Sequence, residues 1–432
     1  MSRLLLAVYA VSRGFNVIIG SQQKIINYLH KLPKGIYFDK SLALNKSSFY
    51  KELTLNGFKV CSLDEEGLSS LNNYQKYITQ RVSSKTLEYA EKVFTWGESE
   101  ARKIIEKYPQ ASKKITITGN PRIDLLKSNY DLKYQDDALK YNSKYGDYIF
   151  FPSNFTVNHA LGRKNLMRLF KNLGRISNQE DVKLYNARLD YFDRTFKEFV
   201  GLVLSVAKKF EDTKIIVRPH PAEDISYWHK ITKEYNNIYI KTSGEAAGWI
   251  KGSKVIVHSS CTTGLEAFVS NKPVIAFLPY EDHEYSKHIS NSVSTKHNNI
   301  KDVIHNLESI INGQTVNNLF EDKREMLLKH VNNINDNDAF TDIIHELEKI
   351  EITKEEFKGV GFNFVNRFKF ALRLLKSYFF NRKAYNYGRQ KFPGITKKEF
   401  ERMFFIMKKT LKIDKKIILN QITKDLFILK NK

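Results

Sequence analysis

The sequence predicts an α/β protein built around buried parallel strands. Three short apolar runs, at residues 215–217, 255–257 and 273–277, are separated by stretches of helical periodicity. Runs of this kind are typical of parallel strands that are covered on both faces of a sheet. The first two runs each stop at a cluster of polar residues, and ligands of such sheets bind at the carboxyl ends of the strands. The region 215–279 is therefore the expected centre of the molecule.

Length and composition indicate two globular domains and an appendage. The chain has 432 residues, too many for one compact core, and its 42% hydrophobic and 13% aromatic content is globular. We expect a first domain at residues 1–146, a second at 147–350 and an extension at 351–432. Cys61 and Cys261 lie far apart and form no CxxC pattern, so neither a disulfide framework nor a zinc site is indicated. A reducing cytoplasm fits this pattern.

The first domain is expected to alternate between helices and strands. A helix runs to Ser12, strands follow at 16–19, 35–38, 58–63, 93–97 and 115–118, and helices at 46–56, 73–92 and 98–108. A Rossmann-like domain normally begins with a strand and then its helix. We therefore expect that the chain begins one strand late and lacks any site residues of the loop after that strand.

The second domain is expected to open with a strand at 148–151. A polar, irregular stretch then reaches about residue 179, and a helix follows at 182–209. After the three apolar runs, helices are expected at 300–311, 316–334 and 339–350.

The first polar cluster is Arg218-Pro219-His220-Pro221, directly after the run 215–217. The two prolines lack backbone donors and hold the loop extended, which fixes the direction of His220. An imidazole held in this way beside Arg218 suits a phosphate or a departing pyrophosphate-like group. The alternative is a turn that carries a surface histidine.

The second polar cluster contains Ser259, Ser260, Thr262 and Thr263, and a helix is expected to begin near Thr262 or Thr263. The free N–H groups and positive dipole end of that helix would bind an anion, and the hydroxyl groups would add donors. Glu266, one turn into the helix, suits the two hydroxyls of a ribose. An ordinary Ser/Thr N-cap is the alternative. Because both clusters follow consecutive strands, we favour a nucleotide site.

The two clusters resemble the paired HP and SS/ST…E motifs of bacterial GT-B glycosyltransferases that use CMP-activated ulosonic acids, such as Kdo and sialic acid transferases. Polyol-phosphate transferases of teichoic acid synthesis carry a similar pair. The chain also resembles the bacterial "surface carbohydrate biosynthesis" proteins over roughly residues 1–280. That resemblance rests on Ile19-Gly20-Ser21-Gln22, Pro33-Lys34-Gly35-Ile36-Tyr37, Asp64-Glu65-Glu66-Gly67, Thr118-Gly119-Asn120-Pro121-Arg122-Ile123-Asp124 and Phe151-Pro152-Ser153-Asn154-Phe155. It implies an α/β, GT-B-like fold, with two Rossmann-like domains facing a cleft and closing helices that cross back to the first domain.

Three carboxylates precede a glycine in Asp64-Glu65-Glu66-Gly67, at the end of the expected strand 58–63. Crowded carboxylates raise one another's pKa and can divide the roles of acid and nucleophile. Retaining Kdo transferases place an acidic pair and a glycine at a comparable strand end, where it supplies the nucleophile. That pattern favours Glu66 and then Glu65, although the family usually has Asp there. The alternative is an acidic cap of the next helix.

Two further loops are candidate donor contacts. Asn120 and Arg122 lie in a turn that enters the inter-domain cleft in many GT-B enzymes, and Arg122 suits a carboxylate or a phosphate. Asp124 in the same turn would instead cap the following helix. Ser153 and Asn154 open the second domain as a donor-contacting loop would, with a simple turn as the alternative.

The extension 351–432 is strongly basic. It contains 21 Lys and Arg against 7 Asp and Glu, so it contributes +14 of the chain's net charge of +23. Aromatic residues such as Phe362, Phe368 and Phe379 are interleaved with these charges, which suits a helix lying on an anionic membrane surface. Nucleic acid is the rival partner, but no recognition motif for it is present. A solvated helical appendage packed on the core is the third interpretation.

The sequence lacks the roughly 18 consecutive apolar residues that a membrane span needs, and its start does not fit a signal peptide. We therefore expect a cytoplasmic, peripheral-membrane glycosyltransferase that moves a nucleotide-activated sugar, such as a CMP-linked ulosonic acid, onto a surface glycan. The scheme requires no metal, because cationic groups and helix N-termini can carry the charge of the leaving group. A CDP-dependent polyol-phosphate transferase and a non-catalytic protein on a degenerate GT-B scaffold are the alternatives.

Overall fold

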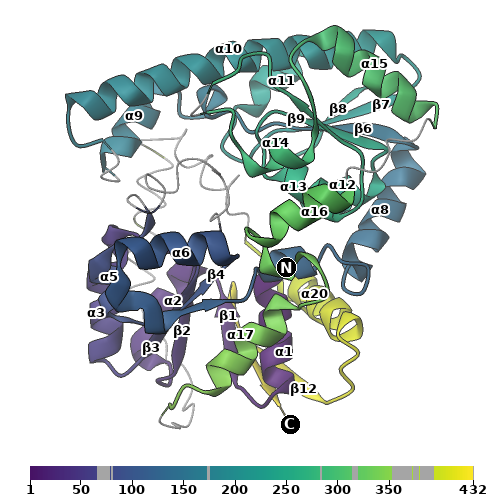
Figure 1. Cartoon of the computed structure of the whole chain (residues 1–432). Helices are drawn as coiled ribbons and strands as arrows, with labels where there is room; N and C mark the ends of the chain where they lie inside the picture. Colours follow the sequence, from purple (N-terminus) through teal and green to yellow (C-terminus); the bar gives the residue numbers. More distant parts are fainter. Residues whose placement is uncertain are drawn as a thin grey trace.

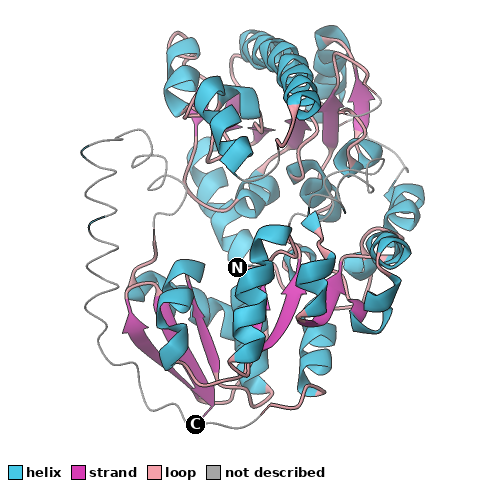
Figure 2. Cartoon of the chain, turned by 90° about the vertical axis from the view of Figure 1, so that its left-hand side faces the viewer, coloured by secondary structure: helices cyan, strands magenta, loops and turns pink. Residues whose placement is uncertain are grey.

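The computed structural model contains two parallel α/β sheets, one above the other, and a small antiparallel sheet (Figures 1 and 2). It describes residues 1–65, 78, 81–172, 176–282, 285–313, 320–352, 372, 379 and 394–431. The two parallel sheets with their covering helices form the expected α/β, GT-B-like fold. The division of the chain at residues 146 and 350 stays a prediction.

The first sheet has the order β2-β3-β4-β5, and all its strands are parallel. The strands are β2 (Ile36–Asp39), β3 (Lys59–Leu63), β4 (Ala90–Thr95) and β5 (Ile115–Ile117). Val60 and Val93 face a core that includes residues of α3 (Ser47–Leu55), α5 (Ser84–Glu88) and α6 (Glu98–Lys107). Cys61 and Phe94 face the opposite side, against α1 (Ser2–Ser12). The helix expected at 73–92 is wrong at its carboxyl end, because β4 already begins at Ala90. Most of the first part of this expected helix lies outside the described residues.

The second sheet has the order β11-β10-β9-β6-β7-β8 and is also parallel. Its strands are β6 (Tyr148–Pro152), β7 (Lys214–Arg218), β8 (Ile238–Ile240), β9 (Val255–His258), β10 (Val274–Phe277) and β11 (Thr295–His297). Alternate residues such as Ile149 and Ile215 pack against α10 (Gln179–Lys209) and α15 (Ile300–Ile311). Phe150 and Ile216 pack on the other face, where α8 (Leu132–Tyr145), α12 (Ala246–Gly252) and α13 (Thr263–Val269) lie (Figure 1). Both faces are covered, as the apolar runs predicted.

Two segments of the second half differ from expectation. The stretch expected to be irregular contains α9 (Arg163–Asn172), which places Leu166 in the protein interior. The helix expected at 316–334 is instead α16 (Phe320–Leu328) followed by the 3₁₀ turn η5 (Asn332–Ile334). The described residues also form the helices α2 (Gln22–Tyr28), α11 (Ile225–Ile231) and α14 (Ile289–Val293). They form the 3₁₀ turns η1 (Leu29–Lys31), η2 (Leu44–Lys46), η3 (Pro109–Lys114) and η4 (Thr156–Asn158) as well.

The two ends of the chain form one antiparallel sheet of order β1-β13-β12. β1 (Val17–Gly20), which we expected as a strand of the first domain, pairs with β13 (Leu426–Asn431), and β13 pairs with β12 (Ile417–Thr423). Phe400 of α20 (Lys397–Thr410) stacks on Phe427 with the ring centroids 3.9 Å apart. The expectation of a purely helical extension is therefore wrong for its last part. Residues 353–371, 373–378 and 380–393, which include Phe362 and Phe368, lie outside the described residues.

The chain crosses back from the second half to the first after η5, as the resemblance implied. The crossing segment ends in α17 (Ala339–Glu348), and Phe340 at its start packs edge-to-face on Tyr9 of α1, with centroids 4.9 Å apart. It also packs edge-to-face on Tyr130, at 5.2 Å. This contact joins the segment to α7 (Pro121–Asp124) and the loop that follows it.

Candidate functional site

The candidate donor loops lie side by side at the carboxyl edge of the second sheet. Ser153 and Asn154 follow β6, His220 follows β7 and Ser259 follows β9, and these three strands are neighbours in the order β9-β6-β7. The polar residues selected from separate parts of the sequence are therefore brought to one edge of one sheet.

Arg218, the last residue of β7, is held by the neighbouring loop. Its guanidinium donates two hydrogen bonds, to the carbonyl oxygens of Ser243 (2.9 Å) and Gly244 (2.7 Å). Burial lowers the pKa of this side chain. Arg218 therefore fixes the loop after β8, and its predicted contact with phosphate stays a prediction.

His220 is exposed and its ring has a defined orientation. Its Nδ1 accepts a hydrogen bond from the backbone N–H of Ala222, at 3.1 Å. A ring nitrogen that accepts carries no proton, so the neutral imidazole bears its proton on Nε2. The side chain can thus donate from Nε2 to an anionic ligand. Pro221 beside it is exposed as well.

Glu223 is a residue of this site that sequence reasoning missed. Its carboxylate is only 2% exposed and accepts hydrogen bonds from Ser153 Oγ (2.8 Å), from the backbone N–H of His220 (3.2 Å) and from Trp228 Nε1 (3.1 Å). Burial raises the pKa of Glu223, against the effect of these donors. In the sequence Glu223 stands beside Asp224 ahead of a helix, which is an ordinary capping pattern and gives no sign of burial.

Ser153 and Asn154 have different surroundings. Ser153 is buried and directs its hydroxyl at Glu223, so it serves the loop structure. Asn154 lies on the same loop and is exposed. Of Ser153 and Asn154, only Asn154 is therefore accessible to a bound substrate.

The second cluster leads into α13 as predicted, with Thr262 at the N-cap position. Ser260 adopts a left-handed backbone conformation (φ 50°), and its Oγ accepts a hydrogen bond from Asn291 Nδ2 at 2.9 Å. Ser259 is largely buried, and Thr263 lies 3.3 Å from the thiol of Cys261. The helix has only seven residues, and the N–H groups of its second to fourth residues already donate to the carbonyl oxygens of Cys261 and Thr262. The expectation that these N–H groups are free for an anion is therefore wrong.

A buried histidine contacts the backbone of this second cluster. His258 at the end of β9 has no exposed surface, its Nε2 lies 2.9 Å from Ser294 Oγ, and its Nδ1 accepts from the N–H of Cys261 (3.3 Å). Burial lowers the pKa of His258 to about 3, so the ring is neutral at physiological pH. A Cβ on Gly264 would lie 2.2 Å from this ring, which explains the glycine in the first turn of α13.

Glu266 forms an ion pair with Arg122, which comes from the turn after β5 of the first sheet. The Glu266 side chain is 6% exposed, and its charge is the main reason that the pKa of Arg122 is raised. The charge of Glu65 acts on Arg122 in the same direction. This pair, from positions 144 residues apart, links the donor loops of the second sheet to the carboxyl edge of the first.

The acidic loop after β3 is partly engaged in ion pairs. Asp64 accepts two hydrogen bonds from Arg81 (2.7 and 2.8 Å), and its carbonyl oxygen accepts from Trp96 Nε1 at 2.6 Å. Glu65 pairs with Arg3 of α1 at 2.8 Å. Glu66 lies outside the described residues. The carboxylate nucleophile implied by the resemblance therefore stays a prediction. In the structure Asp64 is paired with Arg81, and Glu65 is paired with Arg3.

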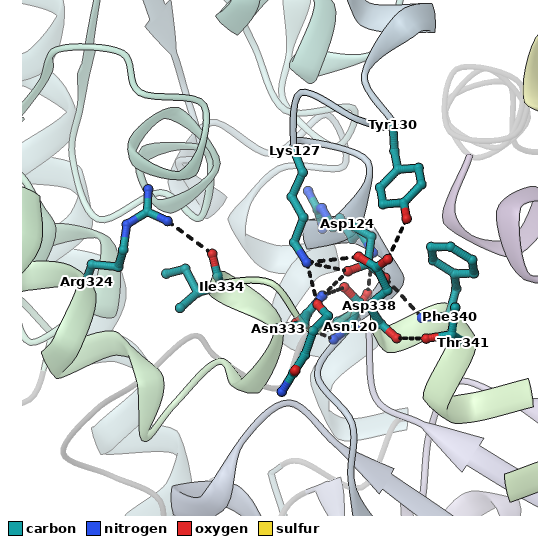
Figure 3. A network of polar contacts seen from close by, with 12 residues as sticks. Asn120, Asp124, Lys127, Tyr130, Arg324, Asn333, Ile334, Asp338, Phe340 and Thr341 are labelled. Carbon is teal, nitrogen blue, oxygen red and sulfur yellow. Dashed lines mark hydrogen bonds and ion pairs between the residues drawn. The ribbon is translucent and has the colours of Figure 1, made fainter. Parts of the chain in front are cut away.

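The turn 119–124 mainly binds the returning chain (Figure 3). Asn120 caps α7 by accepting from the N–H of Arg122 (2.8 Å), and its own N–H donates to Asn333 Oδ1 (3.0 Å). Asp124 is fully buried and accepts from Asn333 Nδ2 (2.6 Å) and from the N–H of Phe340 (3.0 Å). We call these contacts between 119–124 and 332–340 the return clasp. Asp124 thus binds the start of α17, where we had considered a cap of the helix that follows it in the sequence. Arg122 is directed to Glu266 of the candidate site.

Within the ranges that the structure describes, no group of three His, Cys, Asp or Glu side chains is placed to hold a metal ion. The helices of the same ranges are all too short or too polar to cross a membrane.

No protein-family model and no curated protein matches this sequence. Several solved structures are distantly similar. The wall teichoic acid polymerase TagF is 12% identical, with a TM-score of 0.42 over 68% of this chain and 67% of that one. The UDP-GlcNAc 2-epimerase from Neisseria meningitidis bound to UDP-GlcNAc is 14% identical, with a TM-score of 0.46 over 81% of each chain. The UDP-GlcNAc 2-epimerase from Methanocaldococcus jannaschii is 15% identical, with a TM-score of 0.45 over 76% of this chain and 78% of that one. Similarity at this level establishes no activity for this chain.

Proposed function

We propose that this protein is a GT-B-type glycosyltransferase that moves a nucleotide-activated sugar onto a surface glycan. The observation that supports this most directly is the meeting of the loops after β6, β7 and β9 at one sheet edge, linked by Arg122 and Glu266 to the acidic loop of the other sheet. A donor bound at these loops would have its sugar near that boundary. Fold similarity alone would not support an activity, because unrelated functions share such folds.

The nucleotide is proposed to occupy the second sheet. His220 would donate from Nε2 to the phosphate, and hydroxyl groups of the second cluster would add donors. These are Ser259, Ser260, Thr262 and Thr263, with Asn154 and Pro221 at the border. Glu266 would accept from the ribose hydroxyls, which requires that it exchange or share its contact with Arg122.

The donor is proposed to be a CMP-activated ulosonic acid. Arg122 supports this choice, because a guanidinium binds a carboxylate in a bidentate manner and a sugar acid supplies one. In the transfer, the acceptor hydroxyl attacks the anomeric carbon, the bond from that carbon to the phosphate oxygen breaks, and CMP leaves with the electron pair. A carboxylate at 64–66 would take the hydroxyl proton, or would itself attack first as a nucleophile. We propose that no metal is required, because His220 and Arg218 can stabilise the leaving phosphate.

The protein is proposed to work on the cytoplasmic face of the membrane, with residues 351–432 against anionic lipid. The described part of this extension exposes Phe405 on α20 (67%) and Ile418 on β12 (38%) among basic residues. Apolar side chains surrounded by Lys and Arg favour an anionic membrane surface over nucleic acid. The wild type should sediment with vesicles containing phosphatidylglycerol and not with pure phosphatidylcholine, and Phe405→Ser should reduce this binding. Equal binding to both vesicle types would contradict the proposal.

Calorimetric titration with CMP, CDP and UDP tests the donor site. We expect CMP to bind selectively, His220→Ala to abolish binding, and His229→Ala, an exposed histidine of α11, to leave it unchanged. CMP-Kdo and CMP-sialic acids would then be assayed as donors, with and without EDTA. Preference for CDP would favour a polyol-phosphate transferase. The absence of binding by every nucleotide in a folded protein would refute the transferase proposal and favour a non-catalytic protein.

A further inference from the structure

Residues 219–223, directly after β7, contain three backbone N–H groups, because Pro219 and Pro221 have none. All three are satisfied by two residues of the loop itself. The N–H of His220 donates to Glu223 Oε1 (3.2 Å), that of Ala222 donates to His220 Nδ1 (3.1 Å), and that of Glu223 donates to the carbonyl oxygen of His220 (2.8 Å). The direction of the imidazole therefore depends on the carboxylate of Glu223.

The same carboxylate also holds the loop after β6. Ser153 Oγ lies 3.0 and 2.8 Å from its two oxygens, and the N–H of Phe155 donates to Oε1 at 3.1 Å. Trp228, which has no exposed surface, donates to Oε2 from its indole nitrogen at 3.1 Å. The backbones of the two loops are joined as well, since the N–H of Asp224 donates to the carbonyl oxygen of Asn158 (2.7 Å).

These contacts require a carboxylate. Donors from Ser153, Phe155, His220 and Trp228 converge on two oxygens that are 2% exposed, and Asn158 Nδ2 lies 3.5 Å from one of them. An ionised carboxylate only accepts hydrogen bonds and has about four lone-pair sites for them. An amide of the same shape has one acceptor oxygen and turns an NH₂ group toward the remaining donors.

We propose that Glu223 is a positioning residue that sets His220 and the loop carrying Asn154 together for binding the nucleotide phosphate. The identity of the ligand rests on the proposed function, whereas the coupling of the two loops does not. Glu223 is buried beneath both loops and acts through them, without touching the ligand.

The test is Glu223→Gln, with Glu211→Gln, an exposed residue after α10, as the matched control. In protein labelled with ¹⁵N-histidine, the wild-type His220 ring should show an unprotonated Nδ1 and a protonated Nε2 at neutral pH. Glu223→Gln should lose this single tautomer and weaken CMP binding by roughly tenfold or more. Glu211→Gln should change neither. A purely structural effect would lower the melting temperature and leave the tautomer of the folded protein unchanged.

An unchanged His220 spectrum in folded Glu223→Gln would overturn the proposal, whatever the nucleotide affinity. If the wild type binds no nucleotide, the proposed function fails, while the tautomer measurement still decides the role of Glu223. If Glu223→Gln does not fold, hydrogen exchange of the wild type replaces it. The N–H of His220 should then be protected from exchange although its side chain is exposed, and rapid exchange would refute the proposal.

Discussion

Replacing Asp124 by asparagine should remove a specific pH dependence from the stability of this protein. Asp124 is fully buried in the return clasp, and burial raises its pKa from 3.8 to about 6, against the effect of Asn333, Lys127 and the N–H of Phe340. Asp124→Asn keeps the size of the side chain and cannot titrate. It also offers one acceptor oxygen to two donors, which costs about 1–3 kcal/mol at every pH.

The sign of the effect follows from the raised pKa. Between pH 3.8 and about 6, the folded protein binds more protons at Asp124 than the unfolded chain does. The stabilisation by this group is therefore complete below pH 3.8 and is lost as the pH rises through 6. A difference of about two pKa units corresponds to about 3 kcal/mol. The wild type gains this amount on acidification, and the variant does not.

Melting temperatures of wild type and Asp124→Asn between pH 4 and pH 7 measure the effect. Because an unfolding entropy of about 2.1 cal/mol/K per residue makes 1 kcal/mol worth about 1 °C in a chain of 432 residues, the gap between the two proteins should widen by roughly 2–3 °C toward pH 4. Asp136→Asn, which is exposed on α8, is the control and should show a constant gap. A constant gap for Asp124→Asn would refute the reasoning.

Three further experiments test the packing of the site and of the terminal sheet. Gly119→Ala should lower the free energy of unfolding by about 1–3 kcal/mol or more in thermal melts, because the φ of Gly119 is +86° and a Cβ would lie 2.1 Å from a neighbouring side chain. Gly146→Ala, at a glycine with φ +65° and open space around it, should lower it less. Equal losses for the two variants would contradict this. A double-mutant cycle of Arg122→Gln and Glu266→Gln should give a coupling energy of about 1 kcal/mol or more, whereas additive losses would show that the ion pair contributes nothing. Phe427→Ala should destabilise by about 3–5 kcal/mol in urea unfolding if the terminal sheet is part of the core, and a loss below about 1 kcal/mol would exclude that.

The sequence was most informative where a strand is buried on both faces. The runs 215–217, 255–257 and 273–277 became β7, β9 and β10 within a residue or two at each end, because such strands have apolar residues at every position. Helix 300–311 agrees at both ends, with Asn299 accepting from the N–H of Asp302 as N-cap. These elements are specified by their own residues, so local patterns are enough to find them.

The partner of β1 could not be found in this way. Strand periodicity predicted β1 itself, but the strand that pairs with it lies about 400 residues later, in a stretch that its charge marked as a surface helix. The apolar residues of β13 from Leu426 to Leu429 are buried, so they are a core strand set among basic neighbours. The high average content of Lys and Arg over residues 351–432 obscured this short apolar run. A choice between strand partners depends on tertiary packing, which no local pattern contains.

Glu223, which sequence reasoning missed, shares one property with Asp64 and Asp124. Glu223, Asp64 and Asp124 are each at most 5% exposed, and each binds polar groups of a loop or turn next to the end of a parallel strand. Burying a carboxylate is unfavourable unless donors surround it, and those donors come from other segments of the chain. A buried acid therefore looks like a surface residue in the sequence and is recognised only when its donors are known. The loops that would contact a donor are thus positioned by charged residues beneath them, which is why the exposed His220 was predictable and the carboxylate that orients it was not.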